Sequence, residues 1–321
     1  MKRRVLIVRL DAIGDYILFR NVLHFIRKSE KYRDAELTLL GNPAWREIAE
    51  TYDADCADHW IWLENRNSLF RKPIENLLPY CIWHHRVRKA QRRWSGHLKG
   101  AFDEVLSLQA FRDPLLDEFV SDLAPTVVNG WELPQGESPF VFVRNRAIAS
   151  AITGETCDCD LELPRPDVPK TKKVLFFTGA AHWTRRWPKR NWRNLANLLP
   201  SGYSYWHAVK DSTLPEFFKQ VAASAVVVTN DTMASHVAAA LGVPCVTVTN
   251  GVSGKDGFWP YPAELKKPCS AIMPEIKRVP RIIPALLRER LAQYLSLAAI
   301  TPEKVGEELR NSLTSYGKIN Q

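Results

Sequence analysis

The sequence contains no long uninterrupted hydrophobic run. Its first apolar stretch, Val5 to Val8, is soon broken by Arg9 and Asp11, so it is too short for the hydrophobic region of a secretion signal. No segment reaches the roughly 18 consecutive apolar residues that a membrane-spanning helix needs. We therefore expect a cytoplasmic protein that does not cross a membrane.

The cysteines do not follow the spacing of a zinc-binding framework. The sequence has six scattered cysteines, which are Cys56, Cys81, Cys157, Cys159, Cys245 and Cys269. Cys157 and Cys159 lie close together, but no histidine is near them. We expect reduced thiols, no bound metal and no cofactor.

Glycine is scarce where a dinucleotide site would need it. The expected first strand, Val5 to Leu10, is followed by the single Gly14, whereas a Rossmann turn uses three glycines to cradle a pyrophosphate. Asp15 comes next, at the start of an amphipathic helix that we expect to run to about Arg27. Asp15 has two interpretations: a cap of this helix, or a general base held at the mouth of a crevice.

The chain is basic and has the composition of a globular protein. Its 321 residues, 45% of them hydrophobic, suffice for two domains with substantial cores. Because 44 Lys and Arg residues exceed 35 Asp and Glu residues, the net charge of +9 favours an anionic partner such as a nucleotide, a phosphorylated glycolipid or a membrane surface. The basic residues are dispersed and form no nucleic-acid recognition module, so we expect no nucleic-acid partner.

The stretch from Val226 to Gly251 predicts a complete strand, helix, strand unit. The β-branched run Val226 to Val228 is typical of a buried parallel strand, and a helix is expected from Met233 to Leu241, with Thr232 as its N-cap. A second buried strand, Cys245 to Thr249, follows. In such a crossover the free amides of the helix N-terminus lie at the carboxyl edge of the sheet, where a phosphate fits.

The polar residues at this turn have two interpretations. Asn230, Asp231 and Thr232 are of the types that form ordinary strand-to-helix turns, and they also suit a ligand site. His236, within the same helix, is either a core histidine or a functional one. The pattern alone leaves these alternatives open.

The remaining pattern predicts α/β units on both sides of a proline-containing linker between Trp131 and Lys173. We expect strands at 37–40, 59–63, 104–108, 174–178 and 203–209, and helices at 44–52, 114–123, 145–152 and 214–223. The basic loop Trp183 to Arg190 enters a helix at Pro188, and Arg185 and Arg186 are placed to clamp a diphosphate.

One further expected helix, at 82–98, is both basic and amphipathic. It is a candidate contact for anionic lipid headgroups or acceptor phosphates. A solvated helix face is an equally good interpretation.

Three segments together resemble the signature blocks of the bacterial heptosyltransferases, glycosyltransferase family nine. They are RLDAIGD (Arg9 to Asp15), TRRWPKRNW (Thr184 to Trp192) and NDTMASHVAAALGVP (Asn230 to Pro244). Two weaker blocks, FDEVLSLQ (Phe102 to Gln109) and TPEKV (Thr301 to Val305), stand in the family's order, so the resemblance covers most of the chain.

The resemblance implies an α/β fold of GT-B architecture, in which two Rossmann-like parallel-sheet domains face each other across a cleft. Residues 1–165 would form the acceptor-binding domain. Residues 166–321 would form the donor-binding domain with the C-terminal helices.

The resemblance also implies roles for individual residues. Asp15 corresponds to the catalytic base and Arg185 to a ligand of the donor phosphates. The full set of expected donor-binding residues is Arg185, Arg186, Asn230, Asp231, Thr232, Met233, His236 and Gly254, the last in a glycine-containing loop at 251–261. Met233 stands where many family members carry glycine. The expected acceptor-binding residues are Arg9, Gln109 and Arg112.

The expected function is inverting, metal-independent transfer of a heptose or related sugar from a nucleotide-diphosphate donor to a lipopolysaccharide or other bacterial surface-glycan acceptor. Asp15 would take the proton of the acceptor hydroxyl, while arginines and a helix N-terminus stabilise the departing diphosphate. The alternative is a non-catalytic nucleotide- or glycan-binding protein with the same fold. The expected partners are the nucleotide sugar, a glycan or glycolipid acceptor and, as a further candidate, an anionic surface at the inner face of the cytoplasmic membrane.

Overall fold

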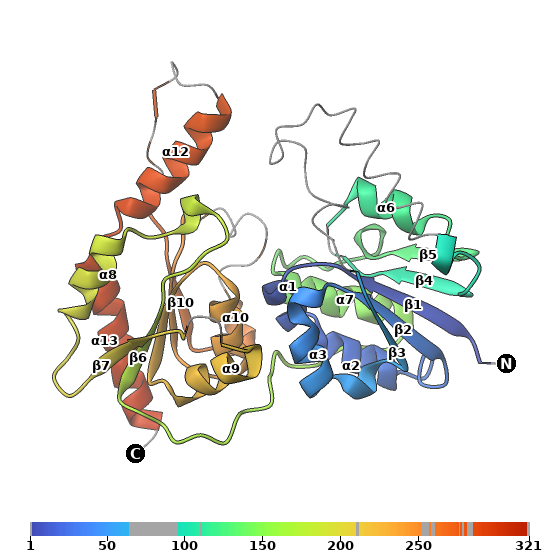
Figure 1. Ribbon diagram of the computed structural model, residues 1–321, viewed down its shortest axis with the longest axis horizontal. Coiled ribbons are helices and arrows are strands. Elements are labelled where there is room, and N and C mark those ends of the chain that lie inside the picture. The colour runs from blue at the N-terminus through green and yellow to red at the C-terminus, as the bar shows by residue number, and fades with distance from the viewer. Residues whose placement is uncertain are drawn as a thin grey trace. The chain divides into compact units, whose positions relative to one another are not determined.

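The computed structural model describes residues 2–63, 96–109, 111–209, 212–251, 257, 261–275, 277, 279–280 and 285–319. Contacts divide the chain into two compact units. The first comprises Met1–Ser138 and Phe142–Cys159, and the second comprises Pro139–Val141 and Asp160–Gln321. Each unit is built on one five-stranded parallel sheet (Figure 1). Almost all of the helix expected at 82–98 lies outside the described residues.

The sheet of the first unit has the strand order β3-β2-β1-β4-β5. Its strands are β1 (Arg4–Arg9), β2 (Glu36–Gly41), β3 (His59–Trp62), β4 (Glu104–Ser107) and β5 (Thr126–Asn129). The described helices of this unit are α1 (Ile13–Ile17), α2 (Arg20–Lys28), α3 (Arg46–Tyr52), α6 (Pro114–Val120) and α7 (Val141–Thr153). The central strand β1 is an apolar run because both its faces are covered: Val5 and Val8 have no exposed surface.

The second unit repeats this plan with the strand order β10-β9-β8-β6-β7. Its strands are β6 (Lys173–Phe177), β7 (Ser204–His207), β8 (Val226–Asn230), β9 (Cys245–Val248) and β10 (Cys269–Ile272). The described helices are α8 (Lys189–Ala196), α9 (Leu214–Ala223), α10 (Met233–Ala240), α12 (Ala285–Ala298) and α13 (Pro302–Ile319). Alternate strand residues, such as Val226 and Val228, pack into one core with Leu297 of α12 and Val305 of α13.

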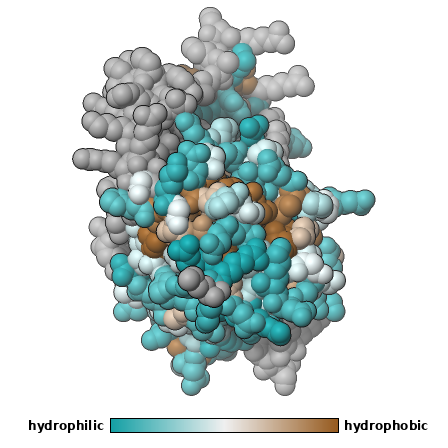
Figure 2. Space-filling view, turned by 90° about the vertical axis from the view of Figure 1, so that its right-hand side faces the viewer, coloured by the Kyte–Doolittle hydropathy of each residue, from teal (hydrophilic) through white to brown (hydrophobic). Residues whose placement is uncertain are grey.

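The expected α/β class and parallel sheets are confirmed. The strands predicted from the sequence are present, and their ends differ by one or two residues from the prediction. Strands β5 and β10 were not predicted. No helix in the described part of the chain combines the length and the apolar composition that a bilayer crossing requires. Hydrophilic residues cover most of the face displayed in Figure 2, with hydrophobic residues gathered across its middle.

The single helix expected from Asp15 to about Arg27 is wrong. The chain forms two helices, α1 and α2, with a break at Leu18 and Phe19. At this break the Leu18 carbonyl oxygen accepts a hydrogen bond from Nδ2 of Asn145, on α7 (3.0 Å). The side-chain donor satisfies a carbonyl that a helix end leaves open, and it comes from a distant part of the chain.

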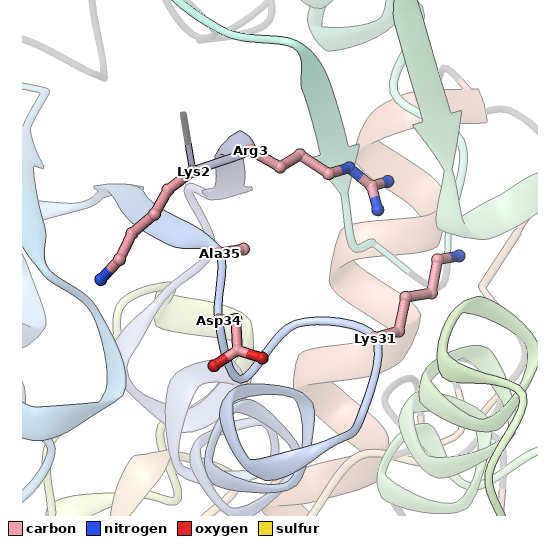
Figure 3. A pocket seen from close by; sticks show the side chains of 5 residues that line it. All are labelled: Lys2, Arg3, Lys31, Asp34 and Ala35. Carbon is pink, nitrogen blue, oxygen red and sulfur yellow. The ribbon is translucent and has the colours of Figure 1, made fainter.

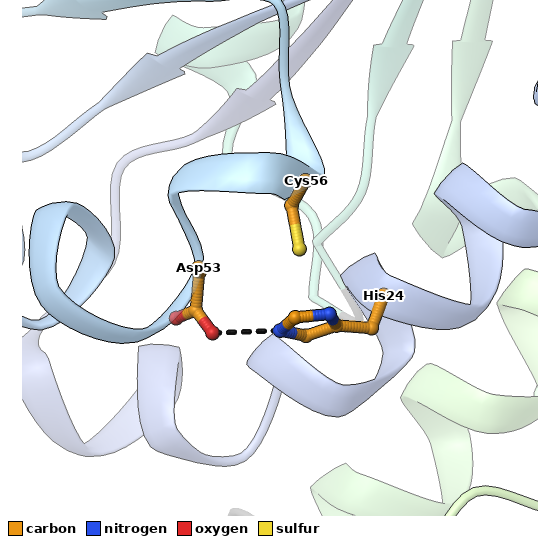
Figure 4. Close-up of side chains that lie close together, drawn as sticks. All are labelled: His24, Asp53 and Cys56. Carbon is orange, nitrogen blue, oxygen red and sulfur yellow. Dashed lines mark hydrogen bonds and ion pairs between the residues drawn. The ribbon is translucent and has the colours of Figure 1, made fainter.

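A buried charge network fixes α1 and α2. Asp53 has no exposed surface, and its carboxylate accepts hydrogen bonds from Tyr16 Oη (2.8 Å), Arg20 Nε (3.2 Å) and Arg20 Nη2 (2.5 Å). His24 Nε2 lies 2.8 Å from the same carboxylate (Figure 4). Burial alone would raise the pKa of Asp53, but the interactions with His24, Arg20 and Tyr16 outweigh it and hold the pKa below the ordinary value.

We predict that Asp53→Ala lowers the free energy of unfolding by about 3–5 kcal/mol, because it leaves the buried Arg20 guanidinium without its counterion. Urea unfolding followed by circular dichroism measures this. A carboxylate whose pKa is lowered by folding adds to the free energy of unfolding. This stabilisation is present above its pKa in the unfolded chain, about 3.9, and is lost as the pH falls through its pKa in the folded protein. Asp53→Asn should therefore remove part of the acid sensitivity of the parent protein.

The matched control is Asp34→Ala. The Asp34 side chain is 91% exposed and lies 3.7 Å from Arg33, so its loss should leave the unfolding curve nearly unchanged. Equal unfolding midpoints for the Asp53→Ala and Asp34→Ala variants would contradict a stabilising role of the network.

Candidate functional site

The carboxyl edge of the second sheet is held together by Asn230. This residue ends β8, has no exposed surface and uses both ends of its amide group. Its Oδ1 accepts a hydrogen bond from the backbone N–H of Trp187 (3.0 Å), and its Nδ2 donates to the carbonyl oxygens of Thr178 (2.7 Å) and Gly179 (3.3 Å). One side chain thus joins the end of β8 to the loop after β6 and to the basic loop before α8.

The N-terminus of α10 opens directly beside Asn230. Thr232 is the N-cap, as predicted: its Oγ1 accepts a hydrogen bond from the Ala234 N–H (3.3 Å) and lies 3.2 Å from Thr229 Oγ1. Asp231 is only 3% exposed and its carboxylate accepts a hydrogen bond from Thr249 Oγ1 (3.3 Å), at the end of β9. The amides of the first turn of α10 are therefore presented at this edge with their partial positive charge.

The basic loop is anchored from two sides. The turn Trp183–Arg185 is tied to the end of β9 by Asn250, whose Nδ2 donates to the Thr184 carbonyl oxygen (3.1 Å). Trp187 is 2% exposed and its Nε1 donates to the carbonyl oxygen of Ile300 (3.0 Å). These contacts bring the loop to the same edge as Asn230 and the start of α10.

The two arginines of this loop differ in their surroundings. Arg186 is exposed, and its Nε donates to the Ala180 carbonyl oxygen (2.9 Å). Arg185 is half-buried, and within the described part of the chain its side chain forms no hydrogen bond or ion pair. A half-buried guanidinium that has no counterion among the described residues is suited to an anionic ligand.

His236 faces inward from α10. It is 5% exposed, and its Nδ1 lies 2.6 Å from Tyr261 Oη. Burial lowers the pKa of His236 to about 4, although Asp231 opposes this shift, and burial raises the pKa of Tyr261. His236 is therefore neutral at pH 7 and does not add positive charge to the site.

Tyr261 belongs to the second unit's edge but was not among the predicted site residues. It ends the glycine-containing loop expected near the donor, where Gly254 lies outside the described residues. Gly257 has a φ of 78°, and its carbonyl oxygen accepts a hydrogen bond from the Val141 N–H (2.8 Å). A Cβ at Gly257 would lie 1.8 Å from the Pro139 carbonyl oxygen, so this position requires glycine.

In the first unit, Asp15 stands in the turn after β1. It occupies the first turn of α1, and its carboxylate accepts a hydrogen bond from the backbone N–H of Ala12 (3.2 Å). The preceding Asp11 carbonyl oxygen accepts from Asn42 Nδ2 (2.8 Å) and Trp45 Nε1 (3.2 Å), and Trp45 stacks on Tyr16 with ring centroids 3.9 Å apart. The turn that carries Asp15 is thus fixed on both sides.

The predicted acceptor residues have different environments. Arg9 is 2% exposed: its Nη1 donates to the Leu108 carbonyl oxygen, its Nε lies 2.7 Å from Asp11 Oδ2, and its guanidinium carbon lies 4.5 Å from the centroid of the Phe19 ring. Gln109 follows Leu108 at the end of β4 and is half-buried, so Arg9 and Gln109 belong to one edge. Arg112 is exposed, with its Nε 3.3 Å from Asp117 and its guanidinium over the Trp131 ring. Their assignment to the acceptor stays a prediction.

Two other clusters do not form comparable sites. The ligand atoms of His24, Asp53 and Cys56 all lie within 4.8 Å of one another (Figure 4), but the Asp53 carboxylate is already saturated by donors and faces the Arg20 cation. This donor set does not fit a metal ion, because an adjacent guanidinium opposes a second cation.

A hollow of about 570 Å³ is lined by Lys2, Arg3, Lys31, Asp34 and Ala35 (Figure 3). It lies at the amino ends of β1 and β2, opposite the edge where open α/β sheets bind ligands. Lys31 Nζ already donates to the Ile152 carbonyl oxygen (2.5 Å), and Arg3 pairs with Glu104 (2.5 Å). Two of its three cations are thus engaged within the protein.

Solved structures share this fold over the whole chain. The family 9 glycosyl transferase of Veillonella parvula has a TM-score of 0.65 and 14% sequence identity, covering 98% of both chains. The chain has the fold of these glycosyltransferases. Escherichia coli heptosyltransferase WaaC with ADP has a TM-score of 0.64 at 15% identity, with 96% of this chain and 99% of that one covered. E. coli ADP-heptose lipopolysaccharide heptosyltransferase II has a TM-score of 0.57 at 17% identity, with 98% and 99% covered.

No family model and no curated protein sequence matches the chain. The resemblance seen in the three sequence motifs is therefore confirmed at the level of the fold, by structures that share fewer than a fifth of its residues. The two α/β units of the heptosyltransferase-like fold correspond to the expected GT-B class.

We predict that Asn230→Ala destabilises the second unit and, if this edge binds a nucleotide such as ADP, weakens that binding. The change leaves the buried Trp187 N–H and the Thr178 carbonyl oxygen without hydrogen-bond partners. Each group that water does not reach should then lower the free energy of unfolding by about 1–3 kcal/mol. Thermal unfolding and calorimetric titration with ADP measure the two effects. The control is Asn194→Ala, an exposed asparagine on α8, which should change neither. Identical behaviour of the two variants would show that Asn230 does not hold the edge together.

Proposed function

We propose that this protein is an inverting glycosyltransferase that transfers a heptose or related sugar from a nucleotide-diphosphate donor to a lipopolysaccharide or other bacterial surface-glycan acceptor. The observation that carries the proposal is the convergence of the N-terminus of α10, Asp231 and the loop of Arg185 at one sheet edge of a glycosyltransferase fold. Among the described residues, the Arg185 side chain has no partner. WaaC was solved with ADP and with ADP-2-deoxy-2-fluoro heptose, which favours a nucleotide-sugar donor here too.

The proposed chemistry assigns one task to each unit. In the second unit, Arg185 and the amides of α10 bind the diphosphate and stabilise the negative charge that it gains when the sugar–oxygen bond breaks. In the first unit, the Asp15 carboxylate removes the proton of the acceptor hydroxyl as that oxygen attacks the sugar carbon. Attack from the face opposite the leaving diphosphate inverts the configuration. The positive charge comes from the protein, so this scheme needs no metal ion.

The proposed acceptor is a lipopolysaccharide or another bacterial surface glycan. An acceptor of this class is assembled at the inner face of the cytoplasmic membrane, so we propose that the protein works in the cytoplasm and contacts anionic lipid headgroups. The net charge of +9 favours such a contact. The non-catalytic alternative predicts that the protein binds the donor but does not turn it over. Measuring donor affinity and turnover on one preparation therefore distinguishes the two functions.

We predict that Asp15→Asn lowers turnover about a hundredfold or more and leaves donor affinity within about twofold, because a general base acts on the acceptor and not on the diphosphate. Asparagine keeps an oxygen that accepts the Ala12 N–H, so folding should be preserved. Release of ADP from ADP-heptose with an inner-core lipopolysaccharide acceptor measures turnover, and calorimetry with ADP measures affinity. Undiminished turnover would leave Asp15 only its role as a helix cap. Donor binding without turnover in the parent protein would favour the non-catalytic alternative.

We further predict that Arg185→Ala raises the dissociation constant for ADP about tenfold or more, since it removes a charge-assisted contact worth about 1.5–3 kcal/mol. Arg193→Ala is the matched control: Arg193 is an exposed arginine of α8, and its loss makes the same change in net charge. The affinity of the control should stay close to that of the parent. If both variants bind ADP alike, the phosphates lie elsewhere. The same titration repeated with GDP and UDP tests the nucleotide class.

A further inference from the structure

Two cysteine thiols lie close together in the segment that follows α7. The sulfur atoms of Cys157 and Cys159 are 3.6 Å apart. The sulfurs of a disulfide are about 2.05 Å apart, so closing the bond would move them together by about 1.5 Å. A separation this small lies within the reach of side-chain rotation.

The backbone around the pair is already held in place by α7. The Cys157 N–H donates a hydrogen bond to Ser150 Oγ (2.9 Å), and the Cys157 carbonyl oxygen accepts one from Arg146 Nε (2.8 Å). Ser150 and Arg146 are one turn apart on α7, and Ser150 Oγ itself donates to the Arg146 carbonyl oxygen (3.0 Å). These bonds fix the backbone of Cys157 beside α7, so this half of the pair needs little further ordering for the bond to form.

The electrostatic surroundings favour a thiolate in the pair. The Cys159 thiol donates a hydrogen bond to the Cys157 sulfur, and Arg146 lies nearby; together they lower the pKa of Cys157 against the opposing effects of burial and Asp158. The same interaction raises the pKa of Cys159. One proton is thus shared between the sulfurs, and the thiolate is the nucleophile in thiol–disulfide exchange.

The place in the fold separates this pair from the other described cysteines, of which Cys269 is partly exposed as Cys159 is. Cys159 is partly exposed and Cys157 is buried beneath it, at 4%. Cys56 is buried alone, and burial raises the pKa of its thiol. Cys245 and Cys269 occupy paired positions on β9 and β10, but Cys245 has no exposed surface and both sit within the sheet ladder.

We propose that Cys157 and Cys159 form a reversible dithiol–disulfide pair that exchanges with small-molecule disulfides of the glutathione class. In the first step the shared proton moves to the Cys157 sulfur, and the partly exposed Cys159 thiolate so formed attacks one sulfur of glutathione disulfide, whose S–S bond breaks and releases one glutathione thiolate. The Cys157 sulfur then attacks the Cys159 sulfur of the mixed disulfide, gives its proton to a glutathione thiolate and expels the second glutathione thiolate. Two protein sulfurs are oxidised and one disulfide is reduced to two glutathiones; the shared proton passes to one of them, and the other takes from the solvent the proton that the pair gave up when its thiolate formed.

The position of the pair gives this chemistry a structural consequence. The division between the two compact units falls between Cys159 and Asp160. A disulfide would close a small ring through Asp158 and restrict the backbone at the last residues of the first unit. Short, partly exposed bridges of this kind are easily reduced, as a regulatory disulfide must be.

The test uses the full-length protein equilibrated with mixtures of reduced and oxidised glutathione. After acid quenching and alkylation, intact mass and peptide mapping count the thiols and locate the bond. The exchange depends on the squared concentration of reduced glutathione divided by the concentration of oxidised glutathione. We expect the occupancy of the Cys157–Cys159 disulfide to rise from one tenth to nine tenths as this quotient falls about 80-fold, as a two-electron exchange requires. Cys157→Ser should instead accumulate glutathione on Cys159, because no thiol resolves the mixed disulfide. Cys159→Ser should form neither product.

The matched control is Cys269→Ala, which removes one cysteine of the paired strands and should leave the titration unchanged. Circular dichroism checks that each variant is folded. The proposal is overturned if the parent protein forms no bond at any glutathione ratio, if mapping joins other cysteines, or if the Cys157→Ser variant shows no glutathione adduct.

Discussion

The candidate donor site depends on the two ends of one buried amide. Parallel strands deliver the loops of β6, β8 and β9 to one edge, but loops rich in polar backbone groups do not pack against each other without partners for those groups. Asn230 supplies them, with an acceptor for the Trp187 N–H and a donor for the Thr178 and Gly179 carbonyls. An aspartate could not donate to the carbonyls, and a leucine of similar size could do neither. The position of Arg185 therefore follows from a side chain that is itself fully buried.

In the first unit, different residues provide hydrogen-bond partners for the backbone groups at the edge of the sheet. The turn after β1 is fixed by Asn42 and Trp45, which both donate to the Asp11 carbonyl oxygen. Below it, Tyr16 connects the turn to the ion pair of Arg20 and Asp53. A buried ion pair adds little net stability against an apolar replacement, but breaking it by removing one partner is costly. Such a network is thus better suited to fixing the geometry of α1 than to stabilising the domain as a whole.

The sequence predicts those parts of the fold that are determined locally. The unit β8, α10 and β9 was predicted because its strands are β-branched and fully buried and because Thr232 is a strong N-cap residue. Strand β5 was missed because it is short and half-exposed, and β10 because its sequence, CSAI, has little β-branched character. The break between α1 and α2 was missed because the residue that binds the open carbonyl there, Asn145, is 127 residues from Leu18.

The same distinction holds for the candidate site. Residues Asn230 to His236 could be found because they form one contiguous motif. The partner of His236 could not, since Tyr261 is 25 residues further along and a tyrosine after a proline-containing loop has no distinctive pattern. Nor does a motif reveal which of two adjacent arginines is engaged: Arg186 donates to Ala180, and this depends on the path of the loop. Local patterns identify the residue types at a site, whereas their pairing is a property of the folded chain.

The charges at this edge of the second sheet determine which group is most important for binding an anion there. The N-terminus of α10 carries about half a positive charge, and the half-buried Arg185 carries a full one. Asp231 opposes both with a full negative charge at 3% exposure. A protonated His236 would add positive charge to this edge, but burial keeps its pKa near 4 and the ring is neutral at pH 7. Arg186 adds a second full positive charge from the exposed side of the same loop, where its Nε is held by the Ala180 carbonyl oxygen. Since the amides of α10 alone do not compensate for Asp231, cations outside the helix are required, and Arg185 is the half-buried one, with no side-chain partner among the described residues.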